Sequence, residues 1–333
     1  MPSKTKRYIV LVFKIIFVLV AYYFVFERIY NSSDINDLKL YFSNITAGNL
    51  LILTLIFLLM FLNWSIESVK WKYTMSKLEN LSFFQSFKAV WTGVTTGTAT
   101  PNRVGEFGGR ILFVSKENRL RATSLTLYAD LSQFIATLLF GIIGFFLFSI
   151  EVSLNENYIQ QFENLIWIFS FIIILITTFL FFYFSVCIRF LQKIPKLYKM
   201  LHRFVPADNL NMKFKLSILF FSMIRYLVFN FQFYLSLLFF DIDISLANSL
   251  IASSSMYLSL NILPNIPFSE IGLRSSFSLL FFGYYTDKHT AVVLASLIVY
   301  IVNIAIPTLI GSWFLILKKR YLLSTTFKKE YQC

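Results

Sequence analysis

Histidine, cysteine and acidic residues are scarce in this sequence. There are two histidines and two cysteines, and Asp and Glu together number 17 against 30 Lys and Arg. Cys187 and Cys333 lie far apart, so they suggest no disulfide framework. His202 and His289 fall in expected loops and form no metal-ligand cluster. Since the sequence also has no Walker loop and no nucleophile elbow, we predict no catalytic residue, no metal site and no cofactor.

Apolar residues are abundant instead. They make up 57% of the chain, which contains 40 Phe and 18 Tyr, and this is too apolar for a soluble core of 333 residues. Long apolar runs with few charges indicate a polytopic membrane protein built from helices. The net charge of +13 would suggest nucleic acid in a soluble domain. Here the basic residues lie between apolar runs, which favours cytoplasmic loops facing anionic lipid, so we expect no nucleic-acid partner.

The apolar runs predict an all-α membrane bundle that forms one domain over residues 1–333. Two shorter runs interrupted by glycine, serine and proline predict re-entrant hairpins near 89–115 and 246–284, which enter from opposite faces. A run of about a dozen residues is too short to cross a hydrocarbon core of ~30 Å as a helix. Six longer runs predict full spans, which cover 8–26, 50–66, 124–150, 165–186, 216–240 and 291–317.

The basic residues orient this bundle. They gather in the expected loop 67–88 and in the connection 187–215, whereas only Arg28, Lys39 and Lys288 fall in expected outer loops. Because cytoplasmic loops carry an excess of Lys and Arg, both termini are predicted to be cytoplasmic in a multi-pass protein of the cell membrane.

A sequence motif occurs twice, once in each predicted hairpin. Residues 101–110 and 264–274 both read Pro-Asn, a short gap, and then Glu-x-Gly-x-Arg. An internal repeat placed in membrane segments is typical of transporters built from two inverted halves. Proline at each hairpin tip would end one half-helix and let the next begin, with its positive N-terminal end in the membrane interior.

Charged and amide side chains at membrane depth are the candidate substrate-binding residues, because a charge there is costly and normally faces a cavity or a partner. Each motif has a Glu-Arg pair four residues apart, which could equally be a structural staple without ligand contact. In that pairing, loss of Glu106 would leave Arg110 alone. Arg103 has no partner nearby in sequence, and Asp130 could pair with Arg225. The candidates are Asn102, Arg103, Glu106, Arg110, Asp130, Arg225, Asn265, Glu270 and Arg274.

The arginines in this set outnumber the acids, which favours an anionic head group as the ligand. Translocation of an anionic phospholipid or lipid-linked intermediate is therefore the leading hypothesis. Asp241 and Asp243 resemble the acidic pair with which membrane glycosyltransferases hold a divalent metal, so a transferase acting on a lipid carrier is an alternative. A small-solute or ion transporter and a scaffold protein are further alternatives. The oligomeric state, the lipid and the energy source are left open.

The two motifs resemble those of a flippase-like membrane family that includes the transmembrane region of lysylphosphatidylglycerol synthases. The first family motif usually reads Pro-Gly-Arg-x-Gly-Glu, and residues 101–106 read Pro-Asn-Arg-Val-Gly-Glu. The second usually has a glycine-rich run and then Gly-x-Arg-Glu, whereas residues 264–274 lack that run and have the acid earlier. The resemblance covers roughly residues 8–317.

This resemblance implies that an amphipathic lipid, either a phospholipid or an isoprenoid-linked carrier, moves between the two leaflets of a membrane. Only about 16 residues follow the last predicted span, so we expect no soluble aminoacyl-transfer domain in this sequence and no transfer of lysine to lipid by this chain alone.

Overall fold

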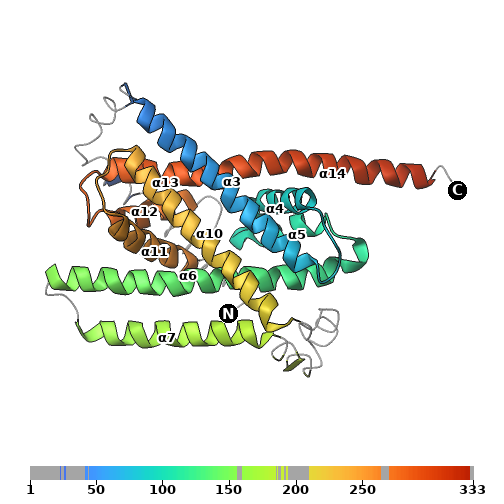
Figure 1. Ribbon diagram of the computed structural model, residues 1–333, viewed down its shortest axis with the longest axis horizontal. Coiled ribbons are helices and arrows are strands. Elements are labelled where there is room, and N and C mark those ends of the chain that lie inside the picture. The colour runs from blue at the N-terminus through green and yellow to red at the C-terminus, as the bar shows by residue number, and fades with distance from the viewer. Residues whose placement is uncertain are drawn as a thin grey trace, which may run out of the picture. The chain divides into compact units, whose positions relative to one another are not determined.

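A computed structural model describes residues 45–155, 160–184, 210–263 and 270–330, with isolated positions before and between these ranges. Every regular element in these ranges is a helix (Figure 1), which confirms the predicted all-α class. The α-helices are α3 (Ala47–Met75), α4 (Phe83–Thr98), α5 (Gly105–Ile111), α6 (Arg119–Asn155), α7 (Gln160–Phe182), α10 (Met212–Phe239), α11 (Leu246–Ile262), α12 (Glu270–Phe282), α13 (His289–Tyr300) and α14 (Ile306–Glu330). Short 3-10 turns occupy Pro101–Arg103 and Lys116–Asn118, and a π-helical turn, Ile301–Ala305, joins α13 to α14.

Four helical stretches in the described ranges are long and apolar enough to cross a membrane. They are Ala47–Met75, Lys116–Val152, Met212–Phe239 and His289–Lys318. Each covers most or all of one predicted span, so the chain is a multi-pass membrane protein, as predicted. The predicted span 165–186 largely coincides with α7, in which Phe171–Phe182 is a shorter apolar helix. The predicted span 8–26 lies outside the described ranges, so the number six stays a prediction.

Helix α3 continues beyond the end predicted for its span. The sequence places that end at Ile66 and a cytoplasmic loop from 67 onward, but α3 runs to Met75. The prediction was wrong because Lys70 is not solvated: it lies buried on the same helix face as Trp71 and Met75. The helix continues because the charges that follow Ile66 find partners inside the protein.

Both predicted hairpins are present as pairs of packed helices. In the first, α4 begins at Phe83 with a capping box in which Ser82 accepts from the Gln85 amide and the Gln85 side chain accepts from the Ser82 amide. The chain then turns at Pro101, and α5 packs back on α4. In the second, α12 packs on α11, while Pro264 and Asn265 lie outside the described ranges. Whether the hairpins are re-entrant stays a prediction.

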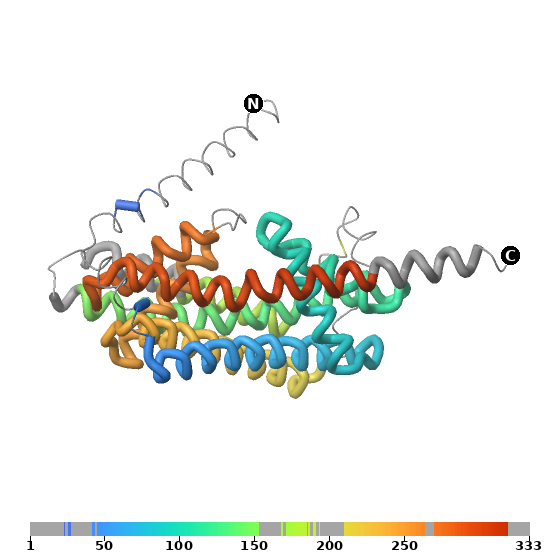
Figure 2. Tube along the Cα trace, turned by 90° about the horizontal axis from the view of Figure 1, so that it is seen from above, coloured from blue at the N-terminus to red at the C-terminus, as the bar shows by residue number. Residues whose placement is uncertain are grey.

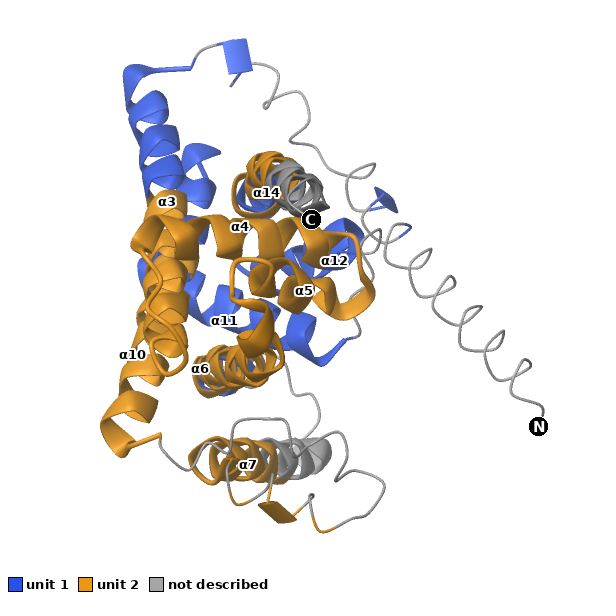
Figure 3. Cartoon of the chain, turned by 90° about the vertical axis from the view of Figure 1, so that its right-hand side faces the viewer, with its two compact units in different colours: residues 1–58, 141–150, 230–301 blue, residues 59–140, 151–229, 302–333 orange. Residues whose placement is uncertain are grey.

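The chain forms two compact units, each assembled from separate segments (Figure 3). Unit 1 comprises residues 1–58, 141–150 and 230–301, and unit 2 comprises residues 59–140, 151–229 and 302–333. Several helices contribute to both units. The first motif belongs to unit 2 and the second motif belongs to unit 1.

Unit 2 is held together by aromatic packing and by close backbone contacts. Tyr128 stacks on Phe181 with ring centroids 4.7 Å apart. Helix α14 runs beside α4 (Figure 2), and Gly311 lies against the Trp91 backbone there, where no side chain would fit. The hydroxyl of Thr95 donates to the Thr308 carbonyl at 2.8 Å across the same contact. These contacts fix the α4–α5 hairpin in unit 2.

Unit 1 has a core of stacked aromatic rings and small residues. Phe233 stacks on Phe282 at 5.0 Å, which joins α10 to α12. Gly144 of α6 faces the Ser254 side chain of α11. Gln232 donates to the Ile56 carbonyl at 2.8 Å. Helix α12, which carries Glu270 and Arg274 of the second motif, packs on α11 and α13 as well as on α10.

Candidate functional site

Glu67 is the centre of a buried network of charges in unit 2. Its side chain is fully buried. One carboxylate oxygen, Oε1, accepts from Arg110 at 2.8 Å, and the other, Oε2, lies 2.8 Å from the Lys70 ammonium and accepts from Arg225 at 3.0 Å. One carboxylate thus binds three cations from α3, α5 and α10. We call Glu67, Lys70, Glu106, Arg110, Asp130 and Arg225 the buried charge cluster.

Arg110 joins the first motif to this cluster. Its guanidinium is 2% exposed and pairs with Glu67 and also with Glu106, one turn earlier on α5. The predicted Glu106–Arg110 pair is therefore present. However, Arg110 would keep Glu67 if Glu106 were lost, so the expectation that it would be left alone was wrong. Gly93 makes room for this arrangement, because a side chain there would meet the Cγ of Arg110 at 2.7 Å.

Arg225 enters the cluster from α10 and has several partners. Besides Glu67, its Nε donates to Asn63 at 3.0 Å and one terminal nitrogen donates to Gln133 at 3.4 Å. The guanidinium carbon lies 5.0 Å from the centre of the Trp64 ring, a cation–π contact. Arg225 therefore forms its ion pair with Glu67, and not with Asp130, which the sequence had suggested as its partner.

Lys70 connects the same network to two serine hydroxyls. Its ammonium is 3.3 Å from the Ser222 hydroxyl, and that hydroxyl is 2.7 Å from the hydroxyl of Ser132 on α6. A buried lysine needs such partners, because desolvating an unpaired ammonium is costly. Helices α3, α6 and α10 are thereby joined around one charge.

Asp130 differs from the other two carboxylates of the cluster. Among the described residues, it forms no hydrogen bond and no ion pair within 4 Å. It is half-buried on α6 and interacts electrostatically with Arg110 and Lys70 on the attractive side, and with Glu67 and Glu106 on the repulsive side. It therefore belongs to the cluster by charge instead of by direct contact.

Arg103 lies at the edge of the cluster, in a strained turn. Asn102 and Arg103 both have positive φ, of 51° and 56°, in the left-handed region that few non-glycine residues adopt. Asparagine tolerates this region well, and the resembled family usually has glycine at the position of Asn102. The turn is held by Thr100, whose hydroxyl accepts from the Gly105 amide at 2.7 Å. Two strained residues in succession cost on the order of 1–3 kcal/mol each and are typical of functional sites.

The guanidinium of Arg103 is incompletely partnered. Its side chain is 29% exposed, but Nε and one terminal nitrogen are buried and have no hydrogen-bond acceptor among the described residues. The nearest acid is Glu106, whose Oε2 lies 3.7 Å from Nε, an ion pair but too long for a hydrogen bond. Buried N–H groups without acceptors are rare, so these donors call for an explanation.

The second motif forms a separate polar group in unit 1. Glu270 and Arg274 pair at 3.5 Å along α12, as their spacing predicts, and both are nearly buried. The Arg274 guanidinium also lies 5.9 Å from the ring centres of Tyr257 and Tyr300. Asn265, the remaining candidate of this motif, lies outside the described ranges.

Glu79 fixes the end of the first hairpin from outside the spans. Its carboxylate accepts from the Ser115 amide and hydroxyl, the latter at 2.6 Å, and from the Asn118 side chain at 3.1 Å. Partial burial alone would raise the pKa of Glu79, but these hydrogen bonds hold that pKa below its ordinary value. The charged form of Glu79 thus ties the turn after α3 to the segment that follows α5.

The structure therefore brings together four predicted residues, Glu106, Arg110, Asp130 and Arg225, with Arg103 at their edge. Sequence reasoning missed Glu67 and Lys70. Their signal was the spacing of Trp64, Glu67, Ser68, Lys70, Trp71 and Met75, which continues one helix face beyond Ile66. Among the described residues, no group of three or more His, Cys, Asp or Glu could hold a metal ion.

A comparison with known protein families gives one match. The family model described as the lysylphosphatidylglycerol synthase TM region matches residues 10–311, which is most of the chain. No curated protein and no solved structure matches the chain. The family match covers both motifs and every residue of the buried charge cluster, and it indicates a function related to membrane lipids.

Proposed function

We propose that this chain, which belongs to the lysylphosphatidylglycerol synthase TM region family, moves anionic lipids from one leaflet of a membrane to the other. The lipid would be a phospholipid or a lipid-linked intermediate with a phosphate in its head group. The observation that carries the proposal is the unsatisfied guanidinium of Arg103, held in a strained turn at the edge of a buried network of charges.

The balance of charge in the cluster supports an anionic ligand. Together with Arg103, the cations of the buried charge cluster are Lys70, Arg110 and Arg225, and its acids are Glu67, Glu106 and Asp130. One positive charge is thus in excess at a depth where an unbalanced charge is costly. A phosphate diester, which carries one negative charge, would restore the balance if it reached this cluster.

The contacts of the arginines support different roles for them in this proposal. Arg110 and Arg225 are already held by Glu67, so they fix the architecture of the site. Arg103 has buried donors to spare, and a planar guanidinium can bind two phosphate oxygens at once. Arg103 would therefore bind the lipid phosphate, while Glu106, between Arg103 and Arg110, would keep both guanidinium groups oriented.

The test is lipid movement in vesicles that contain the purified protein. Fluorescent phosphatidylglycerol and phosphatidylcholine would be followed by quenching of the label in the outer leaflet. We expect the anionic lipid to move faster than phosphatidylcholine. Arg103→Lys should slow its movement by about tenfold or more, because lysine keeps the positive charge but loses the planar guanidinium that can bind two phosphate oxygens. The loss of one charge-assisted hydrogen bond, about 1.5–3 kcal/mol, accounts for a change of this size.

Arg121→Lys is the matched control, since Arg121 is an exposed arginine outside the cluster and should tolerate the same change. Equal movement of both lipids by the wild-type protein would contradict selectivity for an anionic head group. Full transport by Arg103→Lys would exclude the phosphate contact assigned to Arg103.

A further inference from the structure

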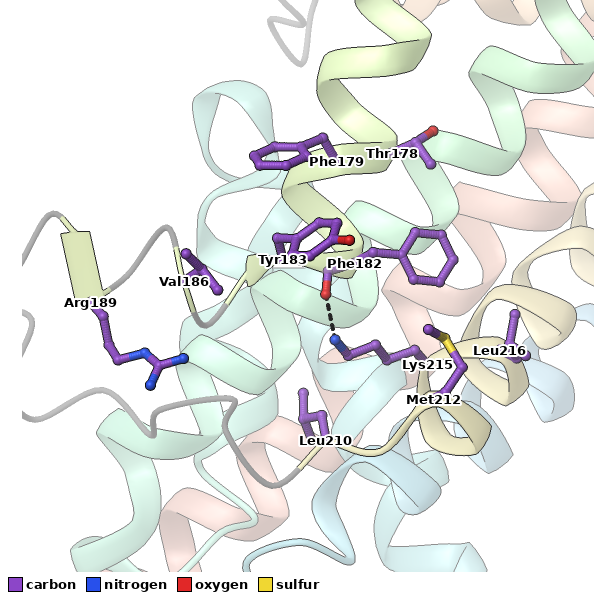
Figure 4. A pocket seen from close by; sticks show the side chains of 10 residues that line it. All are labelled: Thr178, Phe179, Phe182, Tyr183, Val186, Arg189, Leu210, Met212, Lys215 and Leu216. Atoms are coloured by element: carbon purple, nitrogen blue, oxygen red, sulfur yellow. Dashed lines mark hydrogen bonds between the residues drawn. The ribbon is translucent and has the colours of Figure 1, made fainter.

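Unit 2 has a further surface that combines apolar and charged side chains, where α7 ends and α10 begins. An open pocket of about 720 Å³ is formed there (Figure 4). This volume is within the range of cavities that bind small molecules. The pocket is formed without any residue of the buried charge cluster.

The walls of the pocket are apolar and aromatic. Phe179, in the last turn of α7, stacks on Tyr183, which directly follows the helix, with ring centroids 4.8 Å apart. Met212 and Leu216 line the opposite wall at the start of α10. These four side chains are also among the large apolar groups that unit 2 leaves exposed. Such a surface binds a hydrocarbon chain better than it binds water.

Two cations lie at this apolar surface. Arg189 and Lys215 line the pocket, and their side chains extend toward each other from its two sides (Figure 4). The ammonium of Lys215 donates to the carbonyl of Phe182, one of the last carbonyls of α7, which have no partner within the helix. This hydrogen bond holds Lys215 in place at the pocket. The ammonium has two further N–H groups that the bond does not use.

The pocket lies at the end of two membrane-associated helices. The connection between them contains residues 187–211, which include several Lys and Arg, and we predict it to be cytoplasmic. Basic pockets between membrane helices on that side are typical binding sites for anionic lipid head groups. Tyrosine is also frequent at this level of a membrane, which suits Tyr183.

We propose that this pocket binds one anionic phospholipid of the cytoplasmic leaflet. Arg189 and Lys215 would bind the phosphate of the head group, and an acyl chain would lie on Phe179, Tyr183 and Leu216. The two cations suit an anionic head group, and the apolar wall beside them suits the acyl chain that a lipid carries and a free anion lacks. This site does not rest on the proposed transport, because it would bind a resident lipid instead of a passing one.

The experiment is native mass spectrometry of the full-length protein in detergent, titrated with phosphatidylglycerol or phosphatidylcholine. The wild-type protein should retain phosphatidylglycerol preferentially. Arg189→Gln and Lys215→Gln should each weaken that retention by about fivefold, as expected for one cation near a membrane surface. Glutamine at 215 keeps a donor for the Phe182 carbonyl, so the end of α7 should stay intact.

Lys213→Gln is the matched control, because Lys213 is an exposed cation on the same turn of α10 that does not line the pocket. Its lipid binding should equal that of the wild-type protein. Wild-type retention by the Arg189→Gln variant, or an equal loss in Lys213→Gln, would overturn the proposal. Displacement of the lipid by soluble glycerol phosphate at similar concentration would also overturn it, since the pocket would then be a site for a free anion.

Discussion

At the residue scale, the buried charges of unit 2 depend on Glu67 more than on any residue of the repeated motif. Glu67 binds Lys70, Arg110 and Arg225, whereas Glu106 binds Arg110 and Arg103. Lys70 and Arg225 have no other carboxylate within ion-pair distance among the described residues. A neutral side chain at position 67 would thus leave the buried Lys70 and the part-buried Arg225 without a carboxylate in ion-pair contact.

We therefore predict that Glu67→Gln destabilises the protein more than Glu106→Gln does. Removing one partner of a buried ion pair costs about 3–5 kcal/mol, and Glu67 has three such partners. Glu106→Gln should cost less, because Arg110 keeps its 2.8 Å contact with Glu67 and Arg103 is partly exposed. Thermal unfolding in detergent, followed by size-exclusion chromatography, gives the order of the two variants.

Glu117→Gln is the control for this comparison, since Glu117 is exposed in the turn after α5 and should tolerate the loss of its charge. A Glu106→Gln variant less stable than Glu67→Gln would show that the first motif, and not α3, holds the cluster together. Adding Lys70→Gln to Glu67→Gln should recover part of the lost stability, because it removes one of the cations left unpaired.

At the element scale, the sequence predicts the helices more reliably than it predicts their ends. The spacing of Pro101, Glu106 and Arg110 predicted both the hairpin turn and the ion pair, because these depend on residues close together in sequence. The extension of α3 depends on Arg110 and Arg225, which are far from Glu67 in the chain. Hydropathy counts the Glu67 and Lys70 charges as exposed, and only the fold shows that they are neutralised.

The packing of α5 on α4 gives a prediction at the same scale. A side chain on Gly109 would meet the Thr96 hydroxyl, the Thr92 carbonyl at 2.7 Å and the Cα of Gly93 at 2.8 Å, and the last two are backbone atoms. Gly109→Ala should therefore push the two helices apart and destabilise the hairpin by about 1–3 kcal/mol. Transport should fall with it, because the Arg110 contacts depend on this approach.

Gly108 is the matched control for Gly109, because it is the preceding residue of the same helix and a side chain there would meet nothing within 4 Å. Gly108→Ala should be neutral or stabilise the protein by about 0.5–1 kcal/mol, because alanine favours a helix. The two alanine variants are compared by melting temperature in detergent. A Gly109→Ala variant as stable as Gly108→Ala would contradict the close packing of α5 on α4.

At the scale of the whole molecule, the lengths of the hairpin helices bear on how the chain crosses the membrane. Helix α5 has 7 residues and α4 has 16, so they extend about 10 Å and 24 Å. Neither reaches across a hydrocarbon core of about 30 Å. The same holds for α12, whose 13 residues extend about 20 Å. These lengths favour hairpins that enter and leave at one face.

Single cysteines, introduced after replacement of Cys187 and Cys333, would test this topology with a thiol reagent that does not cross membranes. Lys77 and Lys116 are exposed on the two flanks of the first hairpin, and both should react only from the cytoplasmic side if that hairpin is re-entrant. Asp287, which is exposed before α13, should react only from the outside, as should Glu156.

Labelling of Lys77 and Lys116 from opposite sides would mean that the α4–α5 hairpin crosses the membrane. That outcome would reverse the orientation of every later span and exclude two hairpins entering from opposite faces, and with them the inverted repeat.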